Sequence, residues 1–117
     1  MQMNEMDMNG ALPVDGYGPG FFRIDGKRYD GGVLLTGAGA ALWEGLEDRA
    51  ALMALIGRVD VILFGMGAEI AHIPSDLRAA LEGAGVGAEV MNSPSACRTW
   101  NVLVAEGRRV ALAVLPV

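Results

Sequence analysis

The second half of the chain alternates between apolar runs and segments with helical spacing, and this alternation constrains the fold more than any other feature. Residues 60–64 and 109–115 are continuous apolar runs after their first residue. Such runs are typical of strands buried on both faces, as in parallel sheets. Residues 75–82 and 94–106 have helical apolar spacing, and a further strand is predicted at 86–91. Helices and strands that alternate with short connections predict a parallel sheet with helices on its faces.

The first half has a different pattern, typical of antiparallel strands. Asp25 and Gly26 separate two short strand-like runs, 21–24 and 27–29, and both positions of such a tight turn need a positive φ. Residues 33–36 and 41–43 predict two more strands, and 47–56 predict a helix that stops at Gly57.

We therefore expect a single three-layer α/β domain over residues 13–117. It has a mixed, mostly parallel central sheet flanked by helices, and an N-terminal antiparallel hairpin. Residues 1–12 show no periodicity and are predicted to form a flexible tail.

Composition narrows the possible partners and the location of the protein. The 117 residues carry a formal net charge of −5, and aromatic residues make up 6%. The negative charge argues against binding to nucleic acids and to anionic membranes, and the low aromatic content argues further against nucleic acids. The acidic N-terminus has no targeting pattern, and the longest uncharged stretch, 31–43, is shorter than a membrane span. We expect a cytoplasmic protein with no direct membrane insertion, and the composition leaves its oligomeric state open.

The first candidate site is the turn formed by Gly65, Met66 and Gly67, which directly follows a buried strand. Open α/β sheets place ligands at such strand ends. A dinucleotide site would require a third glycine and an immediate helix, and the sequence has neither here. A tight structural turn and a crevice for a small ligand remain as interpretations.

The second candidate is the helix predicted to start at Pro94. Ser93 is expected to cap it, and Trp100 is expected to anchor it in the core. Arg98 and Asn101 lie on the other side. These polar side chains could form hydrogen bonds within the fold, or they could recognise an anion or a partner at the helix N-terminus.

The ligand-binding or partner-binding candidates are Gly65, Met66, Gly67, Ser93, Arg98 and Asn101. We predict no metal site, no cofactor and no catalytic residue. His72 has no second ligand at metal spacing, and Cys97, the one cysteine, is expected to be buried and inert.

Three segments of the chain resemble a known family. They are residues 60–67 (DVILFGMG), 90–103 (VMNSPSACRTWNVL) and 106–112 (EGRRVAL). They are similar to a small domain family of unknown function, with bacterial members, that includes mitochondrial respiratory complex I assembly factor 3 and an adipogenesis-associated cytosolic protein. The resemblance runs from about Gly16 to Pro116. Trp100 stands where we expect tyrosine more often in this family.

The resemblance implies a three-layer α/β fold with an added antiparallel hairpin, and for most members no known reaction. The motif residues that it carries over are Gly65, Met66, Gly67, Arg98, Thr99, Asn101, Glu106 and Arg109. The leading hypothesis is a non-enzymatic interaction or assembly factor with a protein partner, serving respiratory complex I if the role of the mitochondrial branch transfers. The alternative is an enzyme or a binding protein for a small anionic ligand, which would use the Gly65–Gly67 turn and the helix N-terminus at Pro94.

Overall fold

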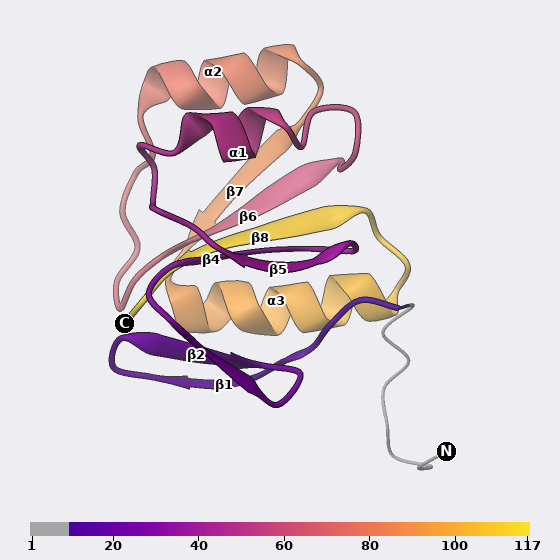
Figure 1. Cartoon of the computed structure of the whole chain (residues 1–117). Helices are drawn as coiled ribbons and strands as arrows, with labels where there is room; N and C mark the ends of the chain where they lie inside the picture. Colours follow the sequence, from indigo (N-terminus) through magenta and orange to yellow (C-terminus); the bar gives the residue numbers. More distant parts are fainter. Residues whose placement is uncertain (1–9) are drawn as a thin grey trace.

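The computed structural model describes residues 10–117, and these residues form two sheets and three helices (Figure 1). The smaller sheet is antiparallel and consists of β1 (Val14–Gly18), β2 (Phe21–Ile24) and β3 (Lys27–Asp30). The larger sheet has the order β5-β4-β8-β6-β7. Its strands are β4 (Val33–Thr36), β5 (Gly39–Leu42), β6 (Val61–Met66), β7 (Gly87–Met91) and β8 (Val110–Leu115). The helices are α1 (Arg49–Met53), α2 (Ser75–Gly83) and α3 (Ser93–Ala105).

The larger sheet is mixed, and the prediction that it is mostly parallel is wrong. β6 runs parallel to both β7 and β8, whereas β4 pairs antiparallel with both β5 and β8. The reason is the position of β8. This strand enters between the parallel pair β6-β7 and the hairpin β4-β5, and so joins the two halves of the chain in one sheet. The expected mixed α/β fold with an N-terminal antiparallel hairpin is confirmed.

The hairpin signal at Asp25 and Gly26 is confirmed in detail. Both residues have positive φ angles, 49° and 80°, and they join β2 to β3. Strand β1 was not predicted, because the glycines at positions 16 and 18 interrupt its apolar pattern. It forms by pairing with β2 along its length.

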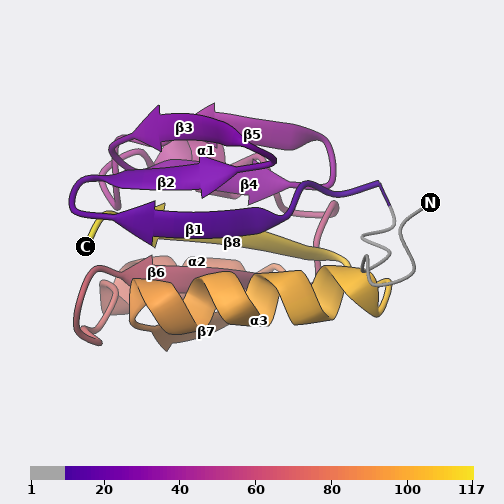
Figure 2. The ribbon, with the colours of Figure 1, turned by 90° about the horizontal axis from the view of Figure 1, so that it is seen from below.

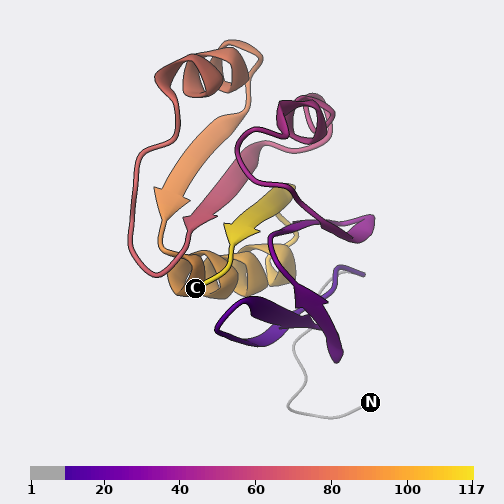
Figure 3. The same ribbon diagram turned by 60° about the vertical axis from the view of Figure 1, so that its left-hand side comes forward.

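Both faces of the larger sheet are covered (Figures 2 and 3). Helices α1 and α2 pack on one face, in a core that includes Leu52, Phe64 and Leu77. On the other face, α3 and the smaller sheet lie side by side (Figure 2) and share a core that includes Phe22 and Trp100. The alternating faces of β6 and β8 supply both cores, which explains why their sequences are apolar without interruption.

Helix α1 is shorter than predicted. It covers Arg49–Met53, and the chain then continues in tight turns with hydrogen bonds such as Leu55 N–H to Leu52 O and Arg58 N–H to Leu55 O. This tightening is common at helix ends.

The predicted tail lies mostly in residues 1–9, outside the described part of the chain. Leu12, at the end of that prediction, is partly buried, and its carbonyl oxygen accepts a hydrogen bond from Trp100 Nε1 over 2.9 Å. None of the helices within residues 10–117 has both the length and the apolar character needed to cross a bilayer.

Candidate functional site

The carboxyl ends of β6 and β8 meet the start of α3, and Ser93 connects all three. Its hydroxyl group accepts a hydrogen bond from Gly67 N–H over 2.9 Å and donates one to the carbonyl oxygen of Leu115 over 2.6 Å. Its backbone N–H donates to Gly67 O over 2.8 Å. Ser93 is fully buried and is the one buried polar residue in the described part of the chain. Burial of a hydroxyl group is tolerated when its hydrogen bonds are made, as they are here.

Gly65 makes room for Ser93. A β-carbon on Gly65 would lie 2.9 Å from Ser93 Cα, 2.9 Å from Ser93 Oγ and 2.7 Å from Val114 Cγ1. Gly67 adopts φ +94°, a conformation that glycine accommodates without steric cost. Gly65 is therefore required for the close approach of α3 to the strand ends, and Gly67 is required for the backbone turn that follows β6. Met66, between the two glycines, packs against the α1–α2 core.

The cap of α3 differs from the prediction. Asn92, rather than Ser93, is the N-cap, and its Oδ1 accepts a hydrogen bond from Ser95 N–H over 2.8 Å. Both residue types are good caps, so the sequence does not distinguish them. Pro94 lies in the first turn, as expected, where its missing N–H costs nothing.

This capping occupies the first turn of α3. Ser93 N–H binds Gly67 O, Ser95 N–H binds the Asn92 side chain, and Ala96 N–H binds Asn92 O, while Pro94 has no N–H to offer. An anion at a helix N-terminus is held by free backbone N–H groups. An anionic ligand at this end would have to displace these internal bonds, and its binding here stays a prediction.

Asn101 and Arg98 have different surroundings, although both were predicted on the same side of α3. Asn101 is partly buried, and its side chain binds the backbone of Val14, with Val14 N–H donating to Oδ1 and Nδ2 donating to Val14 O, each over 2.9 Å. The carboxamide thus imitates a neighbouring strand along the free edge of β1. Arg98 is exposed, and it binds Ser95 Oγ over 3.2 Å. Of the predicted site residues, Arg98 is the one whose side chain is exposed to an incoming partner.

Cys97 and His72 have different surroundings. Cys97 is buried, and this burial raises the pKa of its thiol to about 12. The helix N-terminus therefore does not activate it. His72 is exposed in the loop that follows β6. Within residues 10–117, no three histidine, cysteine or acidic side chains gather as a metal site would require.

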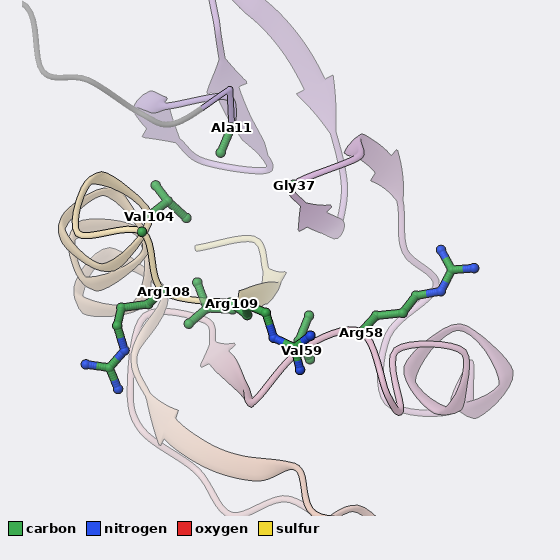
Figure 4. Close-up of a pocket in the computed structure, with 9 residues that line it drawn as sticks. Ala11, Gly37, Arg58, Val59, Val104, Arg108 and Arg109 are labelled. Carbon is green, nitrogen blue, oxygen red and sulfur yellow. The ribbon is translucent and has the colours of Figure 1, made fainter.

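A second polar feature lies at the opposite end of the sheet, near the starts of β6 and β8. A hollow of about 230 Å³ is lined by Ala11, Gly37, Arg58, Val59, Val104, Gly107, Arg108, Arg109 and Val110. Arg109 forms an ion pair with Asp60 over 3.0 Å, and its hydrogen bond to this carboxyl group lowers the pKa of Asp60. Arg58 and Arg108 point away from the hollow on opposite sides (Figure 4). Arg58 was not singled out from the sequence, because no neighbouring motif marks it.

Comparison with known proteins shows which family the chain belongs to. The model of a family of proteins of unknown function, DUF498/DUF598, matches residues 14–115. The chain belongs to the DUF498/DUF598 family. An uncharacterized protein of Rhodobacter capsulatus is 54% identical over 99% of this chain and 94% of its own length. The resemblance noted from the three sequence segments is thereby confirmed.

Relatives of this DUF498/DUF598 chain include proteins named as NADH dehydrogenase assembly factors. Human NADH dehydrogenase [ubiquinone] 1 alpha subcomplex assembly factor 3 is 29% identical over 91% of this chain. The match covers 61% of the human protein, so this chain corresponds to less than two thirds of its length.

Solved structures share the DUF498/DUF598 chain's fold. A crystal structure described as an outer membrane protein from Bartonella henselae has a TM-score of 0.81 at 30% identity, covering 91% of this chain and 95% of that one. A Mth938-like domain from Bordetella pertussis has a TM-score of 0.80 at 25% identity, covering 99% of this chain and 92% of that one.

Proposed function

We propose that this protein is a non-enzymatic interaction or assembly factor whose client is respiratory complex I. One observation carries the proposal, namely its similarity to the human complex I assembly factor across almost the whole of this chain. A shared fold would not suffice, because one fold hosts many functions. Here the similar region includes the structural cluster around Gly65 and Ser93 and the α3 surface with Arg98.

The internal contacts of the site support a role in recognition over one in catalysis. The Ser93 hydroxyl group is buried and bonded on both sides, and the Cys97 thiol is held protonated by burial. A nucleophile needs a base within hydrogen-bond reach and access to a substrate. Ser93 contacts backbone groups of Gly67 and Leu115 instead. The cluster fixes α3 on the sheet, and so gives the outer surface of the helix a defined position.

The outer surface of α3 is the proposed partner contact. Arg98 is exposed, and Val102, one turn further along, is an apolar side chain that is 50% exposed. Residues four positions apart lie on the same helix face. An arginine beside an exposed apolar side chain is a combination found at protein interfaces, where arginine is enriched.

Deletion of the gene in its source organism tests the proposal. We expect less assembled complex I on native gels and a lower NADH:ubiquinone oxidoreductase activity, with succinate dehydrogenase activity unchanged. The wild-type gene restores both, and unchanged complex I levels in the deletion strain would overturn the proposal.

Two charge reversals then locate the surface. Arg98→Glu should fail to restore complex I, whereas Arg58→Glu, with the same change of charge at the other end of the molecule, should restore it. Both purified variants should melt close to the wild-type temperature, because both side chains are exposed. Equal restoration by the two variants would remove Arg98 from the proposed contact without affecting the deletion result.

A further inference from the structure

The free edges of the two sheets differ in how they are protected. β1 and β3 are the edges of the smaller sheet, and β5 and β7 are the edges of the larger one. A free edge offers unpaired backbone N–H and C=O groups to any other strand, and proteins usually block such edges with charges or covering groups. Three of these four edges are blocked in this way.

The block is different at each of the three edges. The Asn101 side chain binds the backbone of Val14 on β1. β3 contains three charged residues in a four-residue strand, KRYD. On β7, the carbonyl oxygen of Ala88 accepts a hydrogen bond from Arg78 Nη1 over 2.9 Å, and the neighbouring Glu89 is exposed.

β5 has no such protection. Its sequence, GAAL, contains no charge and no proline, and the uncharged stretch extends from residue 31 to residue 43. Leu42 is 63% exposed at this edge. In Figure 3, β5 lies at the outer margin of the larger sheet, away from α2 and β7.

The register of β5 shows which of its backbone groups are free to pair. Trp43 N–H donates to Gly32 O over 2.9 Å, and Ala41 lies opposite Leu34. Hydrogen-bonded and non-bonded positions alternate along an antiparallel pair. The backbone groups of Trp43 and Ala41 therefore point towards β4, and those of Ala40 and Leu42 point outwards.

From these observations we infer that the β5 edge is a self-association surface, on which β5 of a second copy of this chain pairs antiparallel across a two-fold axis at Ala41. In this register, Ala40 lies opposite Leu42 of the second copy, so that the two residues exchange their outward backbone hydrogen bonds. The larger sheets of the two copies then form one continuous sheet. This inference is independent of the proposed function.

Charge favours the second copy as the occupant of this edge. A two-fold axis places the residues near it against their own copies, so a charged strand that pairs with itself brings like charges together. Arg28 of β3 and Glu89 of β7 would meet such repulsion, whereas β5 places alanine against alanine.

The face of the larger sheet that α1 and α2 cover adds an apolar surface next to this edge. Ala41 and its cross-strand neighbour Leu34 share this face, because directly opposed residues in an antiparallel pair point to the same side. A cavity of about 640 Å³ lies over Leu34 and is lined by Leu34, Thr36, Gly37, Ala38, Ala51, Ala54, Leu55, Arg58 and Val59. A two-fold axis normal to the sheet places the faces covered by α1 and α2 in the two copies on the same side of the joined sheet. The cavities of the two copies then lie on either side of the axis, and their apolar walls can be buried when the copies associate.

The mass of the purified chain in solution tests the inference. Analytical ultracentrifugation over a wide concentration range should show the 12.2 kDa chain reaching twice its mass as concentration rises. Ala41→Lys and Ala41→Glu should each remain monomeric, because like charges meet at the axis. An equimolar mixture of the two variants should restore the doubled mass. Ala79→Lys, at an exposed position of α2, is the matched control and should associate like the wild type.

Amide hydrogen exchange by NMR identifies the edge directly. The amides of Ala40 and Leu42 should become protected as concentration rises, whereas exposed amides of β3 should not. A wild-type chain that stays monomeric at every concentration would overturn the inference. So would a dimer that persists in Ala41→Lys, or a β5 edge that pairs only with a strand of a different protein.

Discussion

Ser93 lies so close to Gly65 that the α-carbon and the hydroxyl oxygen of the serine are each 2.9 Å from the position of a β-carbon on the glycine. Real β-carbons essentially never approach other atoms so closely. The missing side chain of Gly65 and the short polar side chain of Ser93 therefore act together. Together they hold the start of α3 against the ends of β6 and β8.

Replacement of Ser93 by alanine should destabilise the fold. The change leaves Leu115 C=O without its donor and Gly67 N–H without its acceptor, and each unsatisfied buried group costs about 1–3 kcal/mol. Urea denaturation of the wild type and of Ser93→Ala measures the difference in their free energies of unfolding. Ser95→Ala is the control, because it removes only the exposed contact with Arg98 and should change the free energy of unfolding by less than about 0.5 kcal/mol. Equal losses in the two variants would contradict this account.

Gly65→Ala should lower the free energy of unfolding by about 1–3 kcal/mol, because its methyl group would overlap Ser93 and Val114. Gly83→Ala at the end of α2 is the matched control. Apart from the neighbouring residues and the backbone of α2 itself, no atom lies within 4 Å of a β-carbon there, so the change should stabilise by about 0.4–1 kcal/mol. The double variant Gly65→Ala, Ser93→Ala should lose less than the sum of the single losses, since the second change removes one of the overlapping atoms. Strict additivity would show that the two residues are not coupled.

Asn101→Ala should loosen the attachment of the smaller sheet. It removes both hydrogen bonds to Val14 and leaves these partly buried groups without protein partners, at a cost of about 1–3 kcal/mol. Hydrogen exchange should accelerate in β1 and β2 more than in β6 and β7. Val102→Ala, at an exposed position on the same helix, should leave this pattern unchanged. Uniform acceleration across both sheets would argue against a local role for Asn101.

The thiol of Cys97 should react slowly in the native state. A pKa raised by burial from 9.0 to about 12 leaves roughly a thousandfold less thiolate at a given pH below 9. Iodoacetamide at pH 8 should therefore label the folded protein far more slowly than a Cys97→Ser, Ala79→Cys variant with an exposed thiol. The protonated buried thiol contributes fully to stability below pH 9, and this contribution is lost as the pH rises towards 12. Rapid native-state labelling of Cys97 would contradict its burial.

The ion pair between Asp60 and Arg109 predicts a dependence on acid pH. Because the arginine lowers the pKa of Asp60 below 3.8, the pair contributes to stability above that pH, and the contribution is lost as pH falls through the lowered value. Denaturation at pH 6 and at pH 2.5 should show a deficit for Asp60→Asn, relative to wild type, that shrinks at the lower pH. A deficit of constant size would show that the pair does not act through charge.

Much of the secondary structure follows from local sequence. The apolar runs of β6 and β8, the Asp-Gly turn and the amphipathic spacing of α3 each determine an element without reference to the rest of the chain. β1 does not, because its glycines give no pattern and its pairing with β2 decides its conformation. Nor does the order of the larger sheet follow, since the antiparallel insertion of β8 beside β4 depends on long-range packing.

The sequence predicts where the candidate site lies, but it does not predict which contacts its residues make. The meeting of Gly65, Gly67 and Ser93 follows from a strand end and a helix start. Their mutual hydrogen bonds do not follow, because the choice of Asn92 over Ser93 as the cap rests on the geometry of the strand ends. Likewise, no local pattern reveals that Asn101 binds a backbone 87 positions away along the chain.

The place of β8 has a consequence for how the protein is made. During synthesis β8 leaves the ribosome after β1 to β7, yet it lies between β4 and β6 in the finished sheet. Until β8 is made, no strand joins the β4-β5 hairpin to the β6-β7 pair. Each pair then exposes the edge that β8 later covers. Such edges are the points at which incomplete chains aggregate. β8 therefore covers both of these edges at once, and the larger sheet is complete only when this strand has paired with β4 and β6.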